Sequence, residues 1–111
     1  MRLDVIPQER SGAVLTPVGR LTLTTAHELR QAVDDLVGSG RTRLVVDLSQ
    51  VELIDSSGVG ALVGGLRSAR SGGGDLRLAS ASPQVVTVLR LTNLDRLLRM
   101  HDDPATAFSD D

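Results

Sequence analysis

The N-terminal residues carry one short run in which apolar and polar side chains alternate and a second run that is mostly apolar. These runs are Leu3 to Ile6 and Ala13 to Gly19, and the polar segment QERSG lies between them. An alternating run and an apolar run on either side of a polar, glycine-containing segment predict two antiparallel strands joined by a turn. Because Pro17 has no amide hydrogen, we expect the second strand to lie at a sheet edge or to carry a bulge.

The spacing of apolar positions becomes helical in the next segment, TTAHELRQAVDDLVGSG. Thr24 or Thr25 is suited to cap the start of this helix, and Gly38 or Gly40 is suited to end it. The predicted apolar face consists of Leu29, Ala32, Val33, Leu36 and Val37.

The middle of the chain predicts a buried strand and a second helix. RLVVDL, residues 43–48, is nearly continuous in apolar character, which is typical of a central strand buried on both faces. After SQVELIDSSG comes a helix from about Ser57 to Arg70. Its apolar positions recur at helical spacing, at Val59, Leu62, Val63 and Leu66.

The last third of the chain continues the alternation of strand and helix. After a glycine-rich loop, DLRLAS at 75–80 predicts a strand, and Pro83 suits the first turn of a helix that runs to about Leu91. RLLRM at 96–100 predicts a short final strand, and DPATAF a last short helix. The order β-β-α-β-α-β-α-β predicts an α/β domain with a mixed sheet and packed helices.

Composition favours one globular domain that spans residues 1–111. Hydrophobic residues are 41% and charged residues 23% of the chain, so disorder is not indicated. The N-terminus has no signal-peptide pattern, and the longest apolar stretch, Val59 to Leu66, is too short to cross a bilayer. We therefore expect a cytoplasmic protein with no membrane partner.

The charged and nucleophilic residues exclude several kinds of chemistry. The formal net charge is −2 and the arginines are scattered, so nucleic acid is not an expected partner. The chain has no lysine and no cysteine, which excludes Schiff-base, P-loop and thiol chemistry. His27, expected on the solvated side of the first helix, and His101, expected at a sheet edge, lie far apart in sequence. We therefore expect no metal site and no cofactor.

The segment IDSSGVG, at the start of the second predicted helix, concentrates polar residues and glycines. Asp55, Ser56 and Ser57 are all good helix caps, yet one cap is enough, so at least one hydroxyl is left for another task. The segment is not G-x-S-x-G, and Val63 stands where a dinucleotide fingerprint has its third glycine. Capping alone is one interpretation. The other is a hydroxyl at the positive end of a helix, where a phosphate is favoured.

Residues 44–80, LVVDLSQVELIDSSGVGALVGGLRSARSGGGDLRLAS, resemble the core of a STAS domain of the anti-sigma factor antagonist type. The apolar strand ending in Asp47-Leu48, the motif Asp-Ser-Ser-Gly-x-Gly and the helix after it carry the resemblance, which extends more weakly over nearly the whole chain. It implies the single STAS domain fold. It also implies a bacterial regulator of transcription that is a substrate and a switch, not an enzyme.

The resemblance implies a partner-switching cycle centred on Ser56. In that family the serine after the aspartate is phosphorylated by the anti-sigma factor, a serine kinase of the histidine-kinase-like ATPase fold. The unphosphorylated antagonist captures this kinase and frees a sigma factor; phosphorylation ends the complex, and a metal-dependent serine phosphatase restores it. Carried over, Ser56 is phosphorylated and Asp55 orients it or contacts the kinase. Ser57 then caps the helix, and Gly58 and Gly60 leave room for the kinase.

One turn departs from the family pattern. Such antagonists commonly carry an acidic Gly-x-Leu/Ile-Asp turn after the second strand, whereas this chain reads Gly19-Arg20-Leu21-Thr22. Thr22 replaces the expected aspartate, which alters the expected contact with the kinase. Arg20 is placed to steady a phosphate on Ser56.

Two other functions stay open at this point. A STAS scaffold or adaptor subunit of a stress-sensing or lipid-transport complex would bind partners without regulation of the serine. A small enzyme that uses Asp55 or Ser56 directly is the third reading, and the lack of lysine, cysteine and paired histidines argues against it. The intact Asp55-Ser56 pair favours the phosphorylated antagonist.

Overall fold

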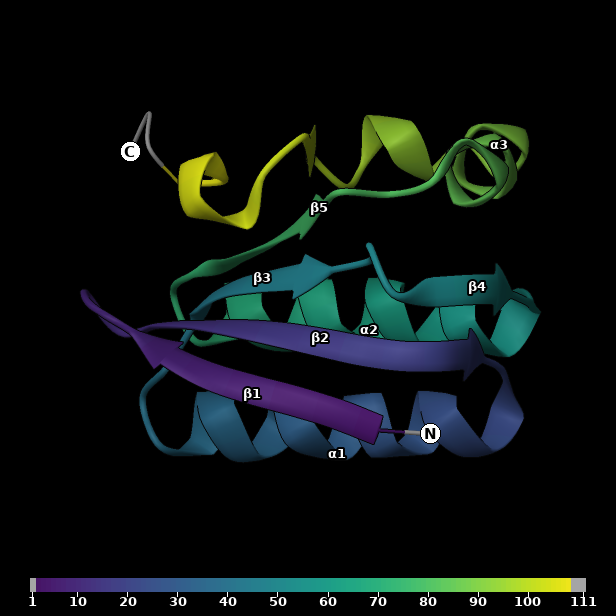
Figure 1. The fold of residues 1–111 in the computed structure, drawn as a ribbon. Coiled ribbons are helices and arrows are strands. Elements are labelled where there is room, and N and C mark those ends of the chain that lie inside the picture. Colours follow the sequence, from purple (N-terminus) through teal and green to yellow (C-terminus); the bar gives the residue numbers. More distant parts are fainter. Residues whose placement is uncertain (1, 109–111) are drawn as a thin grey trace.

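Strands and helices alternate in residues 2–108, the part of the chain that the structure, a computed structural model, describes (Figure 1). The strands are β1 (Arg2–Gln8), β2 (Gly12–Leu21), β3 (Arg43–Asp47), β4 (Val51–Ile54), β5 (Asp75–Ala79) and β6 (Met100–His101). The α-helices are α1 (Leu23–Gly38), α2 (Ser56–Ser71) and α3 (Pro83–Leu91). Two 3-10 turns follow, η1 (Leu94–Arg96) and η2 (Pro104–Thr106). The predicted α/β class with a mixed sheet is confirmed.

The sheet is antiparallel at one edge and parallel elsewhere. β1 pairs antiparallel with β2, with Leu3 opposite Pro17. β2, β3, β5 and β6 run parallel in that order, and β4 pairs with the last part of β2. Parallel neighbours need a crossover, so β2 and β3 are connected through α1, β3 and β5 through β4 and α2, and β5 and β6 through α3 and η1.

The two faces of the sheet bury different residues. Neighbouring side chains of a strand point to opposite faces, so Leu44 and Val46 join the main core while Val45 faces away from it. We call the face packed against α1 and α2, where the main core lies, the inner face (Figure 1). The outer face carries a smaller cluster, which consists of Val45, Ala79 and Ala107 with Val14 and Phe108 packed against them.

Most predicted elements are confirmed to within a few residues. The two N-terminal strands, the central strand and the strand at 75–79 are present, and the three helices end at Gly38, Ser71 and Leu91. The last predicted helix is the 3-10 turn η2. His27 is exposed on α1, and His101 lies on the edge strand β6.

Of the two alternatives predicted for the strand that contains Pro17, a sheet edge or a bulge, the edge is wrong. β2 has neighbours on both sides, and Pro17 is buried. Residues 12–15 pair with β3 and residues 19–21 pair with β4, so Pro17 lies between these two parallel ladders. The strand tolerates the missing amide hydrogen there, and the register shift between Gly19 and Arg20 supplies the expected irregularity.

Three further details differ from the predictions. Strand β4 was not predicted, since its two middle residues are exposed and only Val51 and Ile54 are buried. Thr22 rather than Thr24 or Thr25 is the N-cap of α1. The final strand covers only Met100–His101, because residues 94–96 form a 3-10 turn that ends in a bond from the Leu98 amide to the Leu94 carbonyl.

Candidate functional site

Two helices begin side by side where strands β2 and β4 end. Leu21 of β2 is opposite Ile54 of β4, and the Asp55 amide donates to the Leu21 carbonyl oxygen at 3.3 Å. Each strand is followed at once by a helix, α1 after Thr22 and α2 after Asp55. The carboxyl ends of two parallel strands therefore bring the two predicted segments, 20–22 and 55–60, to one end of the sheet (Figure 1).

Asp55 caps helix α2. Its backbone is extended, with φ −111° and ψ −172°, and its Oδ1 accepts from the Gly58 amide at 3.0 Å. This bond satisfies one of the amides that a helix start leaves without a partner. The prediction that Ser57 is the cap is therefore wrong, because Ser57 lies inside the first turn, where it is half-buried.

Ser56 is the first residue of α2 and is exposed. Its hydroxyl has no hydrogen-bond partner among residues 2–108. Since Asp55 caps the helix, the Ser56 hydroxyl is not needed to hold the backbone. The hydroxyl stands at the positive end of a helix of 16 residues, where an added anion is electrostatically favoured.

The two glycines of the motif do different things. Gly58 is buried, and a Cβ on it would overlap the Leu21 carbonyl oxygen and press on the Ile54 side chain. Gly58 thus leaves space for Leu21 and Ile54 of the same chain. This corrects the prediction that Gly58 leaves room for the kinase. Gly60 is exposed, and a Cβ there would meet nothing within 4 Å.

The turn after β2 is held by a small network of threonines. The Thr22 amide donates to Thr25 Oγ1 at 2.8 Å, and Thr25 Oγ1 donates to the Arg20 carbonyl oxygen at 2.6 Å. Thr22 is half-buried at the helix start. Arg20 is exposed, and its guanidinium makes no hydrogen bond or ion pair with another residue of the described chain.

Two exposed leucines belong to the same end of the sheet and were not predicted from the sequence. Leu23 begins α1 and is 63% exposed, and Leu53 lies opposite Arg20 on β4 and is 51% exposed. Large apolar side chains that remain this exposed are the kind of feature that marks an interaction surface when they gather. The sequence held one signal for this surface, Leu53 within the segment VELI. That segment is recognised as a strand only once its pairing with β2 is known.

The described residues show neither a metal centre nor a membrane span. Among residues 2–108, no three or more His, Cys, Asp or Glu side chains are grouped so as to hold a metal ion. No helix in the same range is both long and apolar enough to cross a membrane.

A family model for STAS domains, described as "Mlab, STAS domain", matches residues 6–99. The chain belongs to the STAS-domain family. A Thermotoga maritima protein named as a candidate anti-sigma factor antagonist is 36% identical over 98 residues, which are 87% of this chain and 87% of the relative. Relatives of this STAS domain are thus named as anti-sigma factor antagonists.

Solved structures agree with this assignment. A crystal structure of a candidate anti-sigma factor antagonist from Thermotoga maritima has a TM-score of 0.89 at 32% identity and covers 97% of this chain and 92% of that one. The phosphorylated form of Bacillus SpoIIAA has a TM-score of 0.77 at 21% identity, and the match covers 98% of both chains. SpoIIAA is named as an anti-sigma factor antagonist. The likeness to SpoIIAA concerns the fold alone.

Proposed function

We propose that this STAS domain is a phosphorylatable anti-sigma factor antagonist in bacterial partner switching. Unphosphorylated, it binds an anti-sigma factor that is also a serine kinase, and the bound sigma factor is released to act in transcription. Phosphorylation of Ser56 ends this complex, and a metal-dependent serine phosphatase restores it. In this cycle, which runs in the cytoplasm, the domain is a substrate and a binding partner rather than an enzyme.

The observation that carries the proposal is the exposed Ser56 hydroxyl beside a helix cap that does not use it. Asp55 Oδ1 already accepts the Gly58 amide, and Ser56 has no partner among residues 2–108. A kinase needs an accessible hydroxyl that can reach the γ-phosphorus of ATP in line with the leaving group. In the step, a bond forms from Ser56 Oγ to that phosphorus, the bond from the phosphorus to the β–γ bridging oxygen breaks as ADP leaves, and the hydroxyl proton passes to a base of the kinase.

The added charge supplies the switch without a change of fold. A phosphoserine adds about −1.5 to −2 charges at neutral pH. Two like unit charges 4 Å apart repel by about 4 kcal/mol at an effective dielectric constant of 20, which corresponds to nearly a thousandfold in affinity. A carboxylate of the partner set near Ser56 would therefore be expelled. The same phosphate is tolerated by this chain because it lies at the positive end of α2.

The surface around Ser56 supports docking of a protein. Leu23 and Leu53 have exposed apolar side chains. Arg20, near the end of β2, adds an exposed positive charge. Thr22 stands where an acidic residue is expected from the family pattern, so the partner's contact at this turn is made to a neutral residue. We expect Arg20 to steady the phosphate on Ser56 by ion pairing.

The experiment measures phosphorylation of this chain and its binding to candidate ATP-dependent anti-sigma kinases. These kinases are taken from the genome that encodes the chain. Phosphate incorporation is mapped by mass spectrometry in the wild-type chain, in Ser56→Ala and in the matched control Ser57→Ala. The proposal expects label on Ser56 that Ser56→Ala abolishes and Ser57→Ala retains. It also expects Ser56→Asp to weaken kinase binding by at least about tenfold, since even one added charge repels.

The scaffold interpretation gives a different result in the same assay. A STAS adaptor would bind its partner with equal affinity in the wild type and in Ser56→Asp, and no kinase-dependent label would be found on Ser56. That pair of results would reject the phosphorylation switch while leaving the STAS family assignment intact.

A further inference from the structure

The turn between β2 and α1, residues 20–22, meets the start of α2 at its middle residue. The Leu21 carbonyl oxygen accepts from the Asp55 amide at 3.3 Å. Arg20 and Thr22, on either side of Leu21, therefore lie close to that helix start. A register shift between β2 and β4 interrupts the regular pairing just before the turn. The conformation of the two flanking residues thus depends on the bonds that the turn makes to α1.

One side chain of α1 holds both flanking residues. Thr25 Oγ1 accepts from the Thr22 amide at 2.8 Å and donates to the Arg20 carbonyl oxygen at 2.6 Å. A hydroxyl has a single hydrogen to donate. The Arg20 carbonyl takes this hydrogen in preference to the Thr22 carbonyl oxygen, which lies farther away at 3.1 Å. The Thr25 hydroxyl thus clamps the peptide groups on both sides of Leu21.

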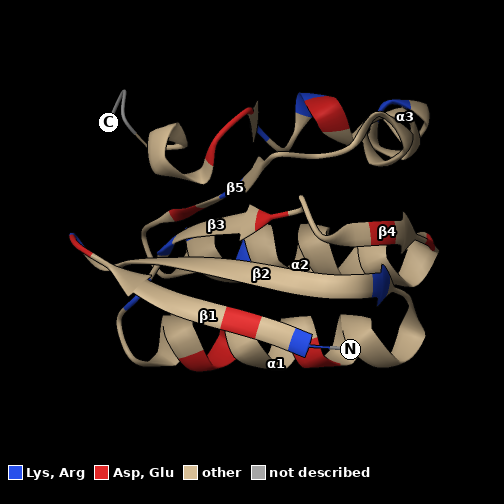
Figure 2. Cartoon of the chain, in the orientation of Figure 1, with Lys and Arg blue, Asp and Glu red and all other residues tan. Residues whose placement is uncertain are grey.

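This clamp requires a side chain that both accepts and donates. At the same helix position, glutamate or glutamine usually accepts from the N-cap amide. A glutamate carboxylate could accept from the Thr22 amide, but it has no hydrogen for the Arg20 carbonyl oxygen. The Thr25 hydroxyl makes both bonds and adds no charge beside the basic end of β2 (Figure 2). The Arg20 guanidinium, which has no partner among residues 2–108, remains available to another protein.

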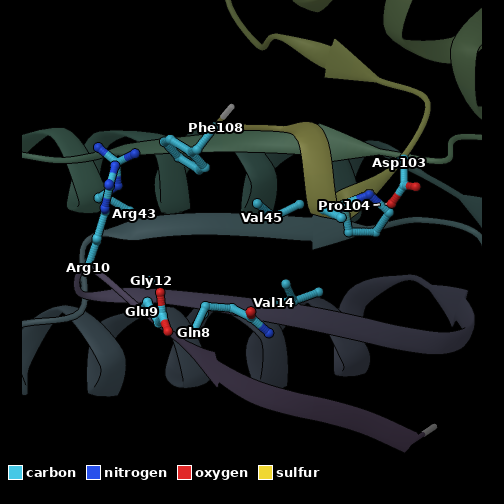
Figure 3. Close-up of a pocket in the computed structure, with 12 residues that line it drawn as sticks. Gln8, Glu9, Arg10, Gly12, Val14, Arg43, Val45, Asp103, Pro104 and Phe108 are labelled. Atoms are coloured by element: carbon cyan, nitrogen blue, oxygen red, sulfur yellow. Dashed lines mark hydrogen bonds between the residues drawn. The ribbon is translucent and has the colours of Figure 1, made fainter. Parts of the chain in front are cut away.

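The turn and the serine belong to an exposed surface. Arg20 and Ser56 are both exposed, and neither lines the hollow on the outer face of the sheet. That hollow lies at the amino ends of β2 and β3, where its lining includes Gly12, Arg43 and Phe108 (Figure 3). A kinase would therefore reach Ser56 across the surface at the other end of the sheet, and the backbone of the turn sets the shape it meets.

We propose that Thr25 is a positioning residue for the phosphorylation of Ser56. The inference rests on the proposed function and extends it to a residue outside the serine motif. Thr25 holds Arg20 and Thr22 in the conformation that the kinase binds, and its hydroxyl takes no part in the chemical step. Loss of this hydroxyl therefore weakens recognition of the chain by the kinase, while the rate of phosphoryl transfer to bound Ser56 stays the same.

The test is the steady-state kinetics of Ser56 phosphorylation by the kinase that labels the wild-type chain. Thr25→Val keeps the shape of the side chain but lacks the hydroxyl. We expect its KM to rise about two- to tenfold, as for the loss of one hydrogen bond, with kcat unchanged. Such a split indicates the loss of binding that substrate and transition state share. Thr25→Ser keeps the hydroxyl and should restore the KM of the wild type.

The neighbouring threonine provides a matched control. Thr24 is exposed, and its hydroxyl has no partner among residues 2–108. Thr24→Val makes the same chemical change one position away, and it should leave KM and kcat unchanged. Circular dichroism checks that each variant is folded. Thr25→Ala, which lacks the hydroxyl but favours the helix, takes the place of Thr25→Val if valine is not accommodated, with the same expected rise in KM.

Hydrogen exchange measures the clamp without a kinase. The Thr22 amide should exchange about two- to tenfold faster in Thr25→Val, because it loses its acceptor. The Gly58 amide should exchange as in the wild type, since Asp55 caps it independently. A faster Thr22 amide together with a raised KM links the turn to recognition of the chain by the kinase.

Four outcomes would overturn the role of Thr25. These are an unchanged KM in Thr25→Val whatever the exchange of the Thr22 amide, equal rises in KM in Thr24→Val and Thr25→Val, no rescue by Thr25→Ser, and a fall in kcat at constant KM. In each case wild-type Ser56 is still labelled, so the proposed function stands. Absence of label on wild-type Ser56 with every candidate kinase would instead reject the proposed function, and the role of Thr25 with it.

Discussion

Gly58 leaves open the space that the Leu21 carbonyl oxygen fills. This contact joins the start of α2 to the end of β2, and it determines how closely Ser56 approaches the turn that carries Arg20 and Thr22. The Asp55 amide bonds to the same carbonyl, so strand end and helix start are tied together by one oxygen. The geometry of the candidate site depends on the absence of a single Cβ.

Gly58→Ala is therefore expected to destabilise the fold by about 1–3 kcal/mol, since a rigid backbone atom blocks the new methyl group. Gly60→Ala is the matched control, because its Cβ enters open space and alanine gains up to about 1 kcal/mol in helix propensity. Urea denaturation measures both free energies of unfolding. Equal stability of the two variants would show that the Leu21 contact does not constrain the helix.

Asp55→Ala is expected to cost about 1 kcal/mol of stability, because the Gly58 amide loses its acceptor. Asp55→Asn should retain most of that stability, since its side-chain oxygen can accept the same bond. Ser57→Ala should change the free energy of unfolding by less than about 0.5 kcal/mol, as for a residue that does not cap. A larger loss in Ser57→Ala than in Asp55→Ala, measured by thermal or urea unfolding, would reverse the cap assignment.

The order of strands and helices could be predicted because periodicity and caps are local. RLVVDL is apolar enough to require burial on both faces, and Pro83 with its preceding serine marks the start of α3 as the structure has it. Strand β4 could not be predicted in this way. Only its end residues, Val51 and Ile54, are buried, and its status as a strand comes from pairing with β2, which is a tertiary property.

The structure brings segments 20–22 and 55–60 to one end of the sheet, but the sequence alone did not show which residue caps α2. Asp55, Ser56 and Ser57 are all favoured at helix starts, so local propensity does not say which residue takes the cap position. The extended backbone of Asp55 decides it. Likewise, Gly58 is needed because its backbone packs against Leu21, which lies 37 positions earlier in the chain. Local sequence does not reveal a contact between residues so far apart.

Phosphorylation of Ser56 is expected to leave the fold intact and the stability unchanged or raised by up to about 1 kcal/mol. The phosphate would lie at the start of α2, where the helix dipole favours negative charge, and this offsets repulsion from the exposed Asp55 carboxylate. Thermal unfolding of purified phosphorylated and unphosphorylated chains measures the difference. A fall in stability of several kcal/mol would mean that the switch acts by unfolding rather than by charge.

The double variant Leu23→Ser and Leu53→Ser is expected to weaken binding to the kinase that we propose as the partner by at least about tenfold. Both side chains are largely exposed, so the loss of apolar contact area falls on the complex and little on the fold. Isothermal titration against the kinase gives the affinity, and circular dichroism checks folding. Leu91→Ser is a matched control, since Leu91 is 79% exposed on α3. An equal loss in the control would argue against a surface centred on Ser56.

Arg77 holds the C-terminal segment on the outer face. It is 4% exposed, donates to the Ala107 carbonyl oxygen at 2.9 Å and lies over the Phe108 ring. Arg77→Met keeps much of the side-chain volume but leaves that carbonyl without this donor, at a cost of about 1.5–3 kcal/mol for a charged hydrogen bond. Because the outer-face cluster is separate from the main core, we expect the loss to be local.

Hydrogen exchange distinguishes a local loss from a global one. Amides of residues 105–107 should exchange about ten- to a hundredfold faster in Arg77→Met, which corresponds to the energy of the lost bond. Amides of α1 and α2 should keep their protection, because they pack on the inner face. The exposed Arg96→Met, measured alongside, should change neither set. Uniformly faster exchange in Arg77→Met would instead mean that the two clusters fold as one unit.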